Sequence, residues 1–245
     1  MDLGASTWTD AAAAETELAV LPVGSTEQHG PHDPLATDAL LAEAVAEAGA
    51  AAYDGEVVVA PTLPYGISEE HRAFAGSLWL SPDTFRAAVG ELVESLAAHG
   101  WRRVVVVNGH GGNTAALREA GRDLTVPGER YVTSFTWFDA VDTSAIDDEA
   151  VKMGHAGPVE TAALLATHPE LVREDRLEEG AAGAADGWGE WLSGVNLAYG
   201  VDEFSENGTV GDPTAATAEV GEALLAEATD ALVELLDAVA TRELD

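Results

Sequence analysis

The segment RRVVVVNGHGGN, residues 102–113, gives the clearest indication of the fold class. Its four consecutive valines are typical of a parallel strand that is buried on both faces of a sheet. A glycine-rich turn follows at once, and TAALREAGRDL, residues 114–124, has the apolar spacing of a helix. A strand that runs directly into a helix is the repeating unit of α/β proteins with right-handed crossovers.

The same unit recurs on both sides of this segment. Apolar runs at residues 17–24, 56–66 and 130–138 predict three more strands. Helices are predicted over residues 37–52, 81–100, 157–172 and 213–244, with Thr37 and Ser81 as N-caps. Residues 177–209 fit neither period and are expected to form a long loop region. The sequence therefore predicts one α/β domain, residues 1–245, with a mostly parallel sheet covered by helices.

The charge of the chain excludes several classes of partner. It has 44 acidic and 11 basic residues, a net charge of −33, and Lys152 is its one lysine. Such a surface repels nucleic acid and anionic membranes. Because 47% of the residues are hydrophobic, we interpret the acids as the surface of a folded, halophilic protein rather than as disorder. In molar salt the Debye length is only ~3 Å, which screens the self-repulsion.

Targeting and redox signals are lacking in the sequence. It contains no cysteine, which excludes disulfides and zinc–sulfur sites. No basic region precedes an apolar segment near residue 1, and no apolar run reaches the ~18 residues of a membrane span. We expect a cytoplasmic protein.

Polar side chains gather where the predicted strands end, the edge at which open α/β sheets bind ligands. PVGSTEQHGPHDPLATDAL, residues 22–40, follows the first strand and contains Glu27, His29 and Asp38. His110 follows the valine strand. GHAGPVET, residues 154–161, opens a later helix and contains a further histidine and glutamate.

Imidazole and carboxylate groups without cysteine suit Zn, Mn, Fe or Co. Glu27 and His29 are two residues apart, so they point to the same side of an extended segment. Three such ligands make one open catalytic site, and five or six with a shared carboxylate hold two ions ~3.5–4 Å apart. Asp38 and Glu160 also suit the first turn of a helix, where a carboxylate favours the dipole, so spacing alone leaves both roles open.

Other polar residues have weaker signals. The loop after the valine strand lacks the third glycine of the G-x-G-x-x-G dinucleotide fingerprint, which argues against a nucleotide site. We expect His32 and Asp33 to line a pocket or face solvent. His71 borders either the site or a subunit contact, and Trp188 belongs either to a substrate lid or to an interface.

Five blocks occur in an order that resembles the creatininase (creatinine amidohydrolase) family, between about residues 21 and 216. They are LPVGSTEQHGPHDPLATDAL, PYGISEEHRAFAGSLWLS, VVVVNGHGGNTAAL, GHAGPVETAALLATHPELV and NGTVGDPTAAT. The resemblance implies a three-layer α/β/α fold with a mostly parallel sheet, usually assembled as a homohexamer. It also implies a metal-dependent amidohydrolase site with one or two divalent ions, Zn, Mn or Fe, per chain.

The resemblance assigns roles to individual residues. Glu27 and Asp38 with His110 would hold one ion, and His29 and Asp38 the other, with Asp38 bridging. His155 matches the residue that handles the proton during C–N cleavage, and Glu160 is either a metal ligand or a catalytic base beside the ligands.

Two positions depart from the creatinine-cleaving pattern. Those members carry a glutamate ligand where this chain has Gly112, and members with a plain GHGGN loop use instead the glutamate that matches Glu160. A tryptophan that closes over creatinine is replaced by Val151. Creatinine is therefore a doubtful substrate by this resemblance.

The predicted function is hydrolysis of a non-peptide C–N bond, in a small-molecule amide, by a metal-activated water. The substrate is a cyclic amide such as creatinine, or a formamidopyrimidine of flavin and deazaflavin biosynthesis as in archaeal deformylases. A third family role is trimming a peptide during redox-cofactor maturation. The halophilic surface favours the deformylase over creatinine. Gly112 motivates an alternative from another class, a metal-binding member that has lost catalysis.

Overall fold

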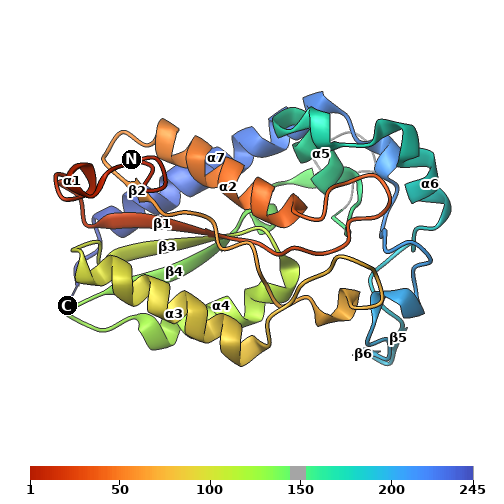
Figure 1. Ribbon diagram of the computed structural model, residues 1–245, viewed down its shortest axis with the longest axis horizontal. Coiled ribbons are helices and arrows are strands. Elements are labelled where there is room, and N and C mark those ends of the chain that lie inside the picture. The colour runs from red at the N-terminus through yellow and green to blue at the C-terminus, as the bar shows by residue number, and fades with distance from the viewer. Residues whose placement is uncertain (144–152, 245) are drawn as a thin grey trace.

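A parallel sheet lies between two layers of helices in the computed structural model, which describes residues 1–143 and 153–244 (Figure 1). Within these ranges one sheet has four strands, which pair in parallel in the order β2-β1-β3-β4. The strands are β1 (Leu18–Val23), β2 (Val58–Val59), β3 (Arg103–Asn108) and β4 (Tyr131–Thr136). The predicted three-layer α/β/α fold is confirmed.

The helices divide between the two faces of the sheet. In Figure 1, α2 (Thr37–Ala52), α5 (Pro158–Thr167) and α7 (Ala218–Ala240) lie above the sheet, and α3 (Pro82–Ala98) and α4 (Thr114–Leu124) lie below it. The smaller elements are α1 (Trp8–Ala11), α6 (Leu177–Ala182), β5 (Trp191–Leu192) and β6 (Val195–Asn196). Within the described ranges, none of the helices combines the length and the apolar character that crossing a bilayer requires.

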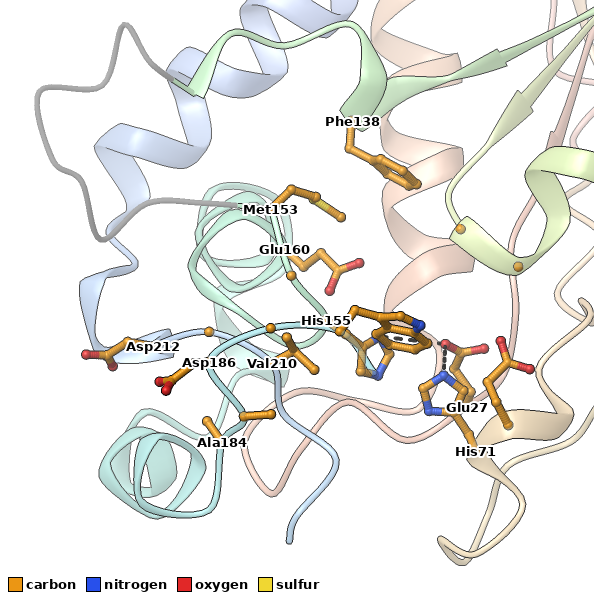
Figure 2. Close-up of a pocket in the computed structure, with 18 of the residues that line it drawn as sticks. Glu27, His71, Phe138, Met153, His155, Glu160, Ala184, Asp186, Val210 and Asp212 are labelled. Atoms are coloured by element: carbon orange, nitrogen blue, oxygen red, sulfur yellow. Dashed lines mark ion pairs between the residues drawn. The ribbon is translucent and has the colours of Figure 1, made fainter. Parts of the chain in front are cut away.

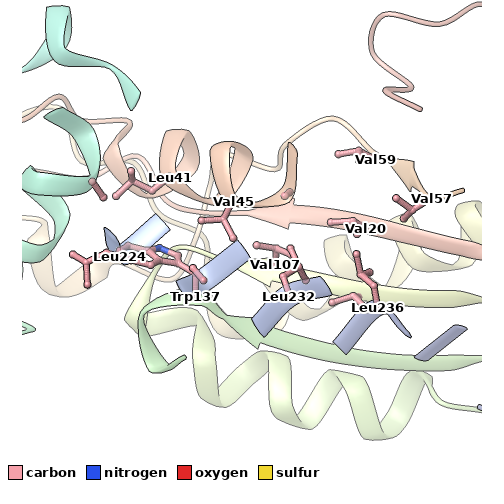
Figure 3. Packing of buried hydrophobic residues seen from close by; sticks show 14 of the residues in the cluster. Val20, Leu41, Val45, Val57, Val59, Val107, Trp137, Leu224, Leu232 and Leu236 are labelled. Carbon is pink, nitrogen blue, oxygen red and sulfur yellow. The ribbon is translucent and has the colours of Figure 1, made fainter. Parts of the chain in front are cut away.

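The valines of β3 are buried on both faces, as their sequence predicts. Val105 and Val107 pack in the core that α2, α5 and α7 cover (Figure 3). Val104 and Val106 pack on the opposite face with side chains of α3 and α4. Two cores therefore hold β3 in place from both sides, and its last residue, Asn108, has a fixed position at the edge of the sheet.

Some predicted boundaries are wrong for local reasons. Thr37 is the first residue of α2 rather than its N-cap, because its hydroxyl donates to the Pro34 carbonyl. The last helix begins at Ala218, where the Thr217 side chain caps it, and Pro213–Ala215 forms a separate 3-10 turn. The predicted loop region at residues 177–209 contains α6 and the β5–β6 hairpin. Of residues 56–66, only the two of β2 pair as a strand.

The strand order sets the place of the site. The chain moves from β1 outward to β2 and then returns to β3 on the other side of β1. In sheets of this kind ligands bind at the crevice beyond the carboxyl ends of the two strands where the order reverses. The segments that follow β1 and β3 carry Glu27, His29 and His110 to this point.

We predict that Leu232→Ala lowers the free energy of unfolding by about 2–5 kcal/mol, because it opens a cavity in the apolar core between α7 and the sheet. Leu232 is fully buried, and α2 packs so closely that a Cβ on Gly49 would lie 2.5 Å from its Cδ2 atom. The control is Glu234→Ala, an exposed position of the same helix, with an expected change within about 0.5 kcal/mol. Urea denaturation measures both, and equal effects would contradict this core.

Candidate metal centre

Five predicted site residues meet at the carboxyl edge of the sheet. Glu27 and His29 follow β1, Asp38 lies in the first turn of α2, His110 follows β3, and Glu160 lies in the first turn of α5. All five are buried, with relative exposures between 0% and 5%. This burial shows that the three carboxylates do not belong to the halophilic surface, and the five residues stay the predicted ligands.

Asp38 lies between two histidines. Its Oδ1 atom is 3.1 Å from His29 Nε2, and its Oδ2 atom is 3.2 Å from His110 Nδ1. Glu27 Oε1 is 3.3 Å from the same His110 nitrogen, and Glu160 Oε2 is 3.9 Å from His29 Nε2. The two oxygens of Asp38 therefore face two different groups of ligand atoms, as a bridging carboxylate does.

Four buried polar atoms of the cluster lack a hydrogen bond. Both Glu27 oxygens, Asp38 Oδ2 and His29 Nε2 are buried without a hydrogen-bond partner, so their close contacts do not have hydrogen-bond direction. A buried polar atom in this state is costly. Ligand atoms of Glu27, Asp38 and His110 lie within 4.8 Å of one another, and so do those of His29, His155 and Glu160. Imidazole and carboxylate donors in this arrangement fit a divalent cation such as Zn, Mn or Fe.

Backbone carbonyls orient the two histidines. His110 Nε2–H donates to the Ile67 carbonyl at 2.7 Å, which leaves Nδ1 to face Glu27 and Asp38. His29 Nδ1–H donates to the Glu27 carbonyl at 3.2 Å, which leaves Nε2 to face Asp38 and Glu160. Such bonds on the far nitrogen fix the tautomer of a metal-binding histidine.

The loop after β3 is held by amide side chains and close backbone contacts. Asn108 donates to the His110 carbonyl at 2.7 Å and accepts from its N–H at 3.1 Å. Asn113 accepts from the Ile67 N–H at 2.9 Å, which positions the carbonyl that orients His110. A Cβ on Gly109 would lie 2.1 Å from the Asp38 carbonyl oxygen, so only glycine allows this approach of the loop to α2.

The charges of the cluster oppose its burial. Burial lowers the pKa of His29, but Asp38 and Glu160 raise it more strongly, to about 10. Burial likewise disfavours charged His110, yet Glu27 and Asp38 hold its pKa well above the usual value. Burial raises the pKa of Glu160 to about 8. Without a metal ion, protons on these groups therefore balance the carboxylates at neutral pH.

A second histidine pair lies beside this cluster. The Gln28 side-chain amide lies 2.8 Å from His71 Nδ1 and 3.1 Å from the Gly208 carbonyl, and these two acceptors use both of its hydrogens. His155 Nε2–H then donates to the Gln28 backbone carbonyl at 2.7 Å, so His155 Nδ1 is an acceptor. Burial, followed by the positive charge of His29, lowers the pKa of His155 well below its usual value.

The sequence left His71 either at the site or at a subunit contact, and it did not indicate a role for Gln28. The structure places His71 Nε2 3.2 Å from Glu27 Oε1, so the GISEEHRAF block borders the site. The ligand atoms of Glu27, His71 and His155 also lie within 4.8 Å of one another. His71 reaches Gln28 and Glu27 because residues 68–71 fold over the segment after β1. No local pattern in the sequence predicts this contact.

His32 and Asp33 neither line the pocket nor face solvent, so that prediction is wrong. His32 Nε2 donates to the Ala156 carbonyl at 3.0 Å, and Asp33 Oδ2 accepts from the Thr161 hydroxyl at 2.7 Å. Ala156 has a positive φ of 50°, and its N–H donates to Glu160 at 2.7 Å. The buried pair holds a strained backbone segment between His155 and Glu160.

The cluster forms one end of a cavity of about 880 Å³. Figure 2 shows Glu27, His71, His155 and Glu160 pointing into it, with Asp186 and Asp212 at the other end. Trp188 lines it as well, with its ring 6.0 Å from those of His71 and His155. Val151, the position expected to carry the closing tryptophan of creatininases, lies outside the described residues.

The model of the family described as creatininase, creatinine amidohydrolase, matches residues 4–236. The chain belongs to the creatininase family. It is therefore a hydrolase of carbon–nitrogen bonds, as predicted, and the alternative of a member without catalysis is not favoured.

Individual creatininase relatives agree with this assignment. A mycofactocin precursor peptide peptidase of Mycobacterium ulcerans is 39% identical, over 86% of this chain and 81% of that protein. A creatinine amidohydrolase of Pseudomonas putida is 32% identical, over 71% and 75%. The crystal structure of a creatinine amidohydrolase homologue from Bacteroides fragilis aligns with a TM-score of 0.80 at 25% identity, over 100% and 98% of the two chains.

We predict that Gly112→Ala lowers metal affinity by about 10- to 100-fold, because it displaces the carbonyl that orients His110. The new Cβ would lie 2.3 Å from the Ile67 oxygen and 2.5 Å from His110 Nε2. Gly111→Ala is the control, since a Cβ there meets no atom within 4 Å. Competition with a chelating dye measures both affinities, and equal values would refute the role of Ile67.

Metal uptake at pH 7 should release protons. His29, with a pKa of about 10, and His110 hold protons there, and a metal ion needs the lone pairs of both rings. Affinity should therefore increase as the pH rises from 6 toward 10, because less proton displacement is required. Titration calorimetry of Zn²⁺ or Mn²⁺ in buffers of different ionisation enthalpy counts the protons. Uptake without proton release would contradict this charge state.

Proposed function

We propose that this chain hydrolyses an amide bond in a peptide substrate, with the help of one or two divalent ions. The observation that carries the proposal is a cluster of buried, unpartnered ligand atoms at one end of a cavity of about 880 Å³. This volume lies at the upper end of the range for ligand pockets and far exceeds the size of creatinine. Mycofactocin precursor peptide peptidases, 35–40% identical over 86–94% of this chain, support a peptide.

Glu27, Asp38 and His110 would hold one ion, and His29, Asp38 and Glu160 the second. Creatininases of known structure include a manganese form and a mutant of Zn–Zn type. A bound divalent ion supplies acidity to water at neutral pH and polarises a carbonyl. Glu160 would then replace the glutamate ligand that creatinine-cleaving members carry at the position of Gly112.

His155 is the proposed proton carrier. Its Nδ1 atom is an acceptor, 3.8 Å from Glu27 Oε1, because Nε2–H is held by the Gln28 carbonyl. Since its lowered pKa keeps the ring neutral at pH 7, Nδ1 must first accept a proton from the attacking water. The same nitrogen then gives the proton to the leaving amine, which completes C–N cleavage. Gln28 keeps the ring in the required tautomer.

Other sequence predictions remain proposals alongside this one. We propose, from the sequence, a cytoplasmic location and assembly as a homohexamer, with a formamidopyrimidine as the alternative substrate. We propose that the net charge of −33 adapts the surface to concentrated salt, in which screening reduces repulsion between carboxylates.

A substrate comparison tests the proposed function. The metal-loaded protein should cleave a precursor-type peptide in preference to creatinine or a formamidopyrimidine, measured by mass spectrometry of the products. Asp38→Asn should lower kcat/KM by about 10²-fold or more, because it weakens both ion sites while preserving side-chain size. Asp123→Asn, an exposed position of α4, is the matched control. Full activity of Asp38→Asn would refute the proposal.

A further inference from the structure

A second, smaller cleft adjoins the cavity of the metal centre. Its volume is about 320 Å³, and Trp188 and Glu70 line both hollows. The Trp188 ring contacts Phe204 on the side of the cleft, with centroids 5.5 Å apart, and lies 6.0 Å from His71 on the side of the cavity. Trp188 is therefore the wall between the catalytic groups and the cleft.

The cleft has mostly apolar walls, and Glu69, Glu70 and Asn196 are the polar residues of its lining. The walls come from three separate parts of the chain: the segment before α3, the β5–β6 hairpin and the 3-10 turn at Val201–Glu203, and the lining side chains include Ile67, Leu80, Ala198, Tyr199, Val201 and Phe204. The two glutamates of the cleft disfavour an anionic ligand, and the mostly apolar surface suits an uncharged group. Its volume lies at the lower end of the range for ligand pockets, which suits one side chain rather than a whole cofactor.

Hydrogen bonds hold the outer wall in place. Asn196 Oδ1 accepts from the N–H groups of Glu190 and Ala198, at 3.0 and 3.2 Å. Glu203 Oε1 accepts from the N–H groups of Tyr199 and Gly200, at 2.8 and 2.6 Å. The cleft is therefore formed before any ligand binds, which reduces the entropic cost of binding.

We propose that this cleft is a specificity subsite that binds an apolar side chain, aromatic or large aliphatic, next to the scissile amide of the substrate. The inference rests on the proposed function, since it assigns a further part of the same substrate. Its basis is the adjacency of the two hollows, which share Trp188 and Glu70 in their linings, together with the mostly apolar walls of the smaller one.

Paired peptides test the subsite. Each pair shares one scissile amide and differs only by Phe or Ala beside it, first on one side of the bond and then on the other. In one of the two pairs, the KM of the Phe peptide should be about 10-fold or more below that of the Ala peptide. The reason is that the Phe ring moves from water into the apolar cleft. Calorimetry with metal-free protein, which cannot turn over the peptides, should give the same preference in Kd.

A variant that fills the cleft tests whether the preference for Phe over Ala arises there. Ala198→Trp places an indole in the cleft and should raise the KM of the Phe peptide to that of the Ala peptide, without changing kcat. Val195→Trp, an exposed position of the same hairpin outside both hollows, should leave the preference intact. Because Ala198 is half-buried and beside the surface, the variant is expected to fold, which circular dichroism checks.

The outcomes separate the two proposals. Absence of cleavage with retained Phe preference in Kd refutes the proposed function and supports the subsite. Cleavage with equal values for both members of each pair refutes the subsite and leaves the proposed function standing. If Ala198→Trp preserves the Phe preference, or if it changes the mass in sedimentation instead of KM, the cleft is not a substrate subsite.

Discussion

Two carboxylates that are buried beside one another constrain the rest of the structure. Glu27 and Asp38 are 0% and 1% exposed, and the same histidine nitrogen of His110 lies 3.3 and 3.2 Å from their oxygens. Ionised groups removed from water are strongly destabilising unless a positive charge compensates them. In the metal-free chain, protons on His29 and His110 provide this charge. A divalent cation would provide it as well and would also satisfy the unpartnered lone pairs.

The fold supports this arrangement at some distance from it. Two apolar cores fix β1 and β3 side by side, and both strands end at the crevice where the strand order reverses. Glycine at position 109 lets the loop after β3 approach the start of α2, and backbone carbonyls select the histidine tautomers. The buried pair His32 and Asp33 serves the same purpose for the segment that carries His155 and Glu160.

Much of this could be predicted from the sequence where the signal is local. Four valines in β3 predicted a strand buried on both faces, and residues at the strand ends predicted the site. What could not be predicted depends on contacts between distant segments. The amide of Gln28 joins His71 to Gly208, and Trp188 reaches the same histidine from the loop after α6. Neither contact leaves a period or spacing in the sequence. His32 was expected in the pocket or in solvent because its contact with Ala156 likewise has no local signal.

Anomalous diffraction from crystals grown with Mn²⁺ or Zn²⁺ tests most directly whether the buried carboxylates and histidines bind metal. We expect a peak bonded to His110 Nδ1, Glu27 and Asp38, at about 2.0–2.2 Å for zinc. With two ions per chain, the second peak should lie between His29 Nε2, Asp38 and Glu160. Metal peaks elsewhere, with none among these side chains at saturating metal, would contradict this assignment of the ligands.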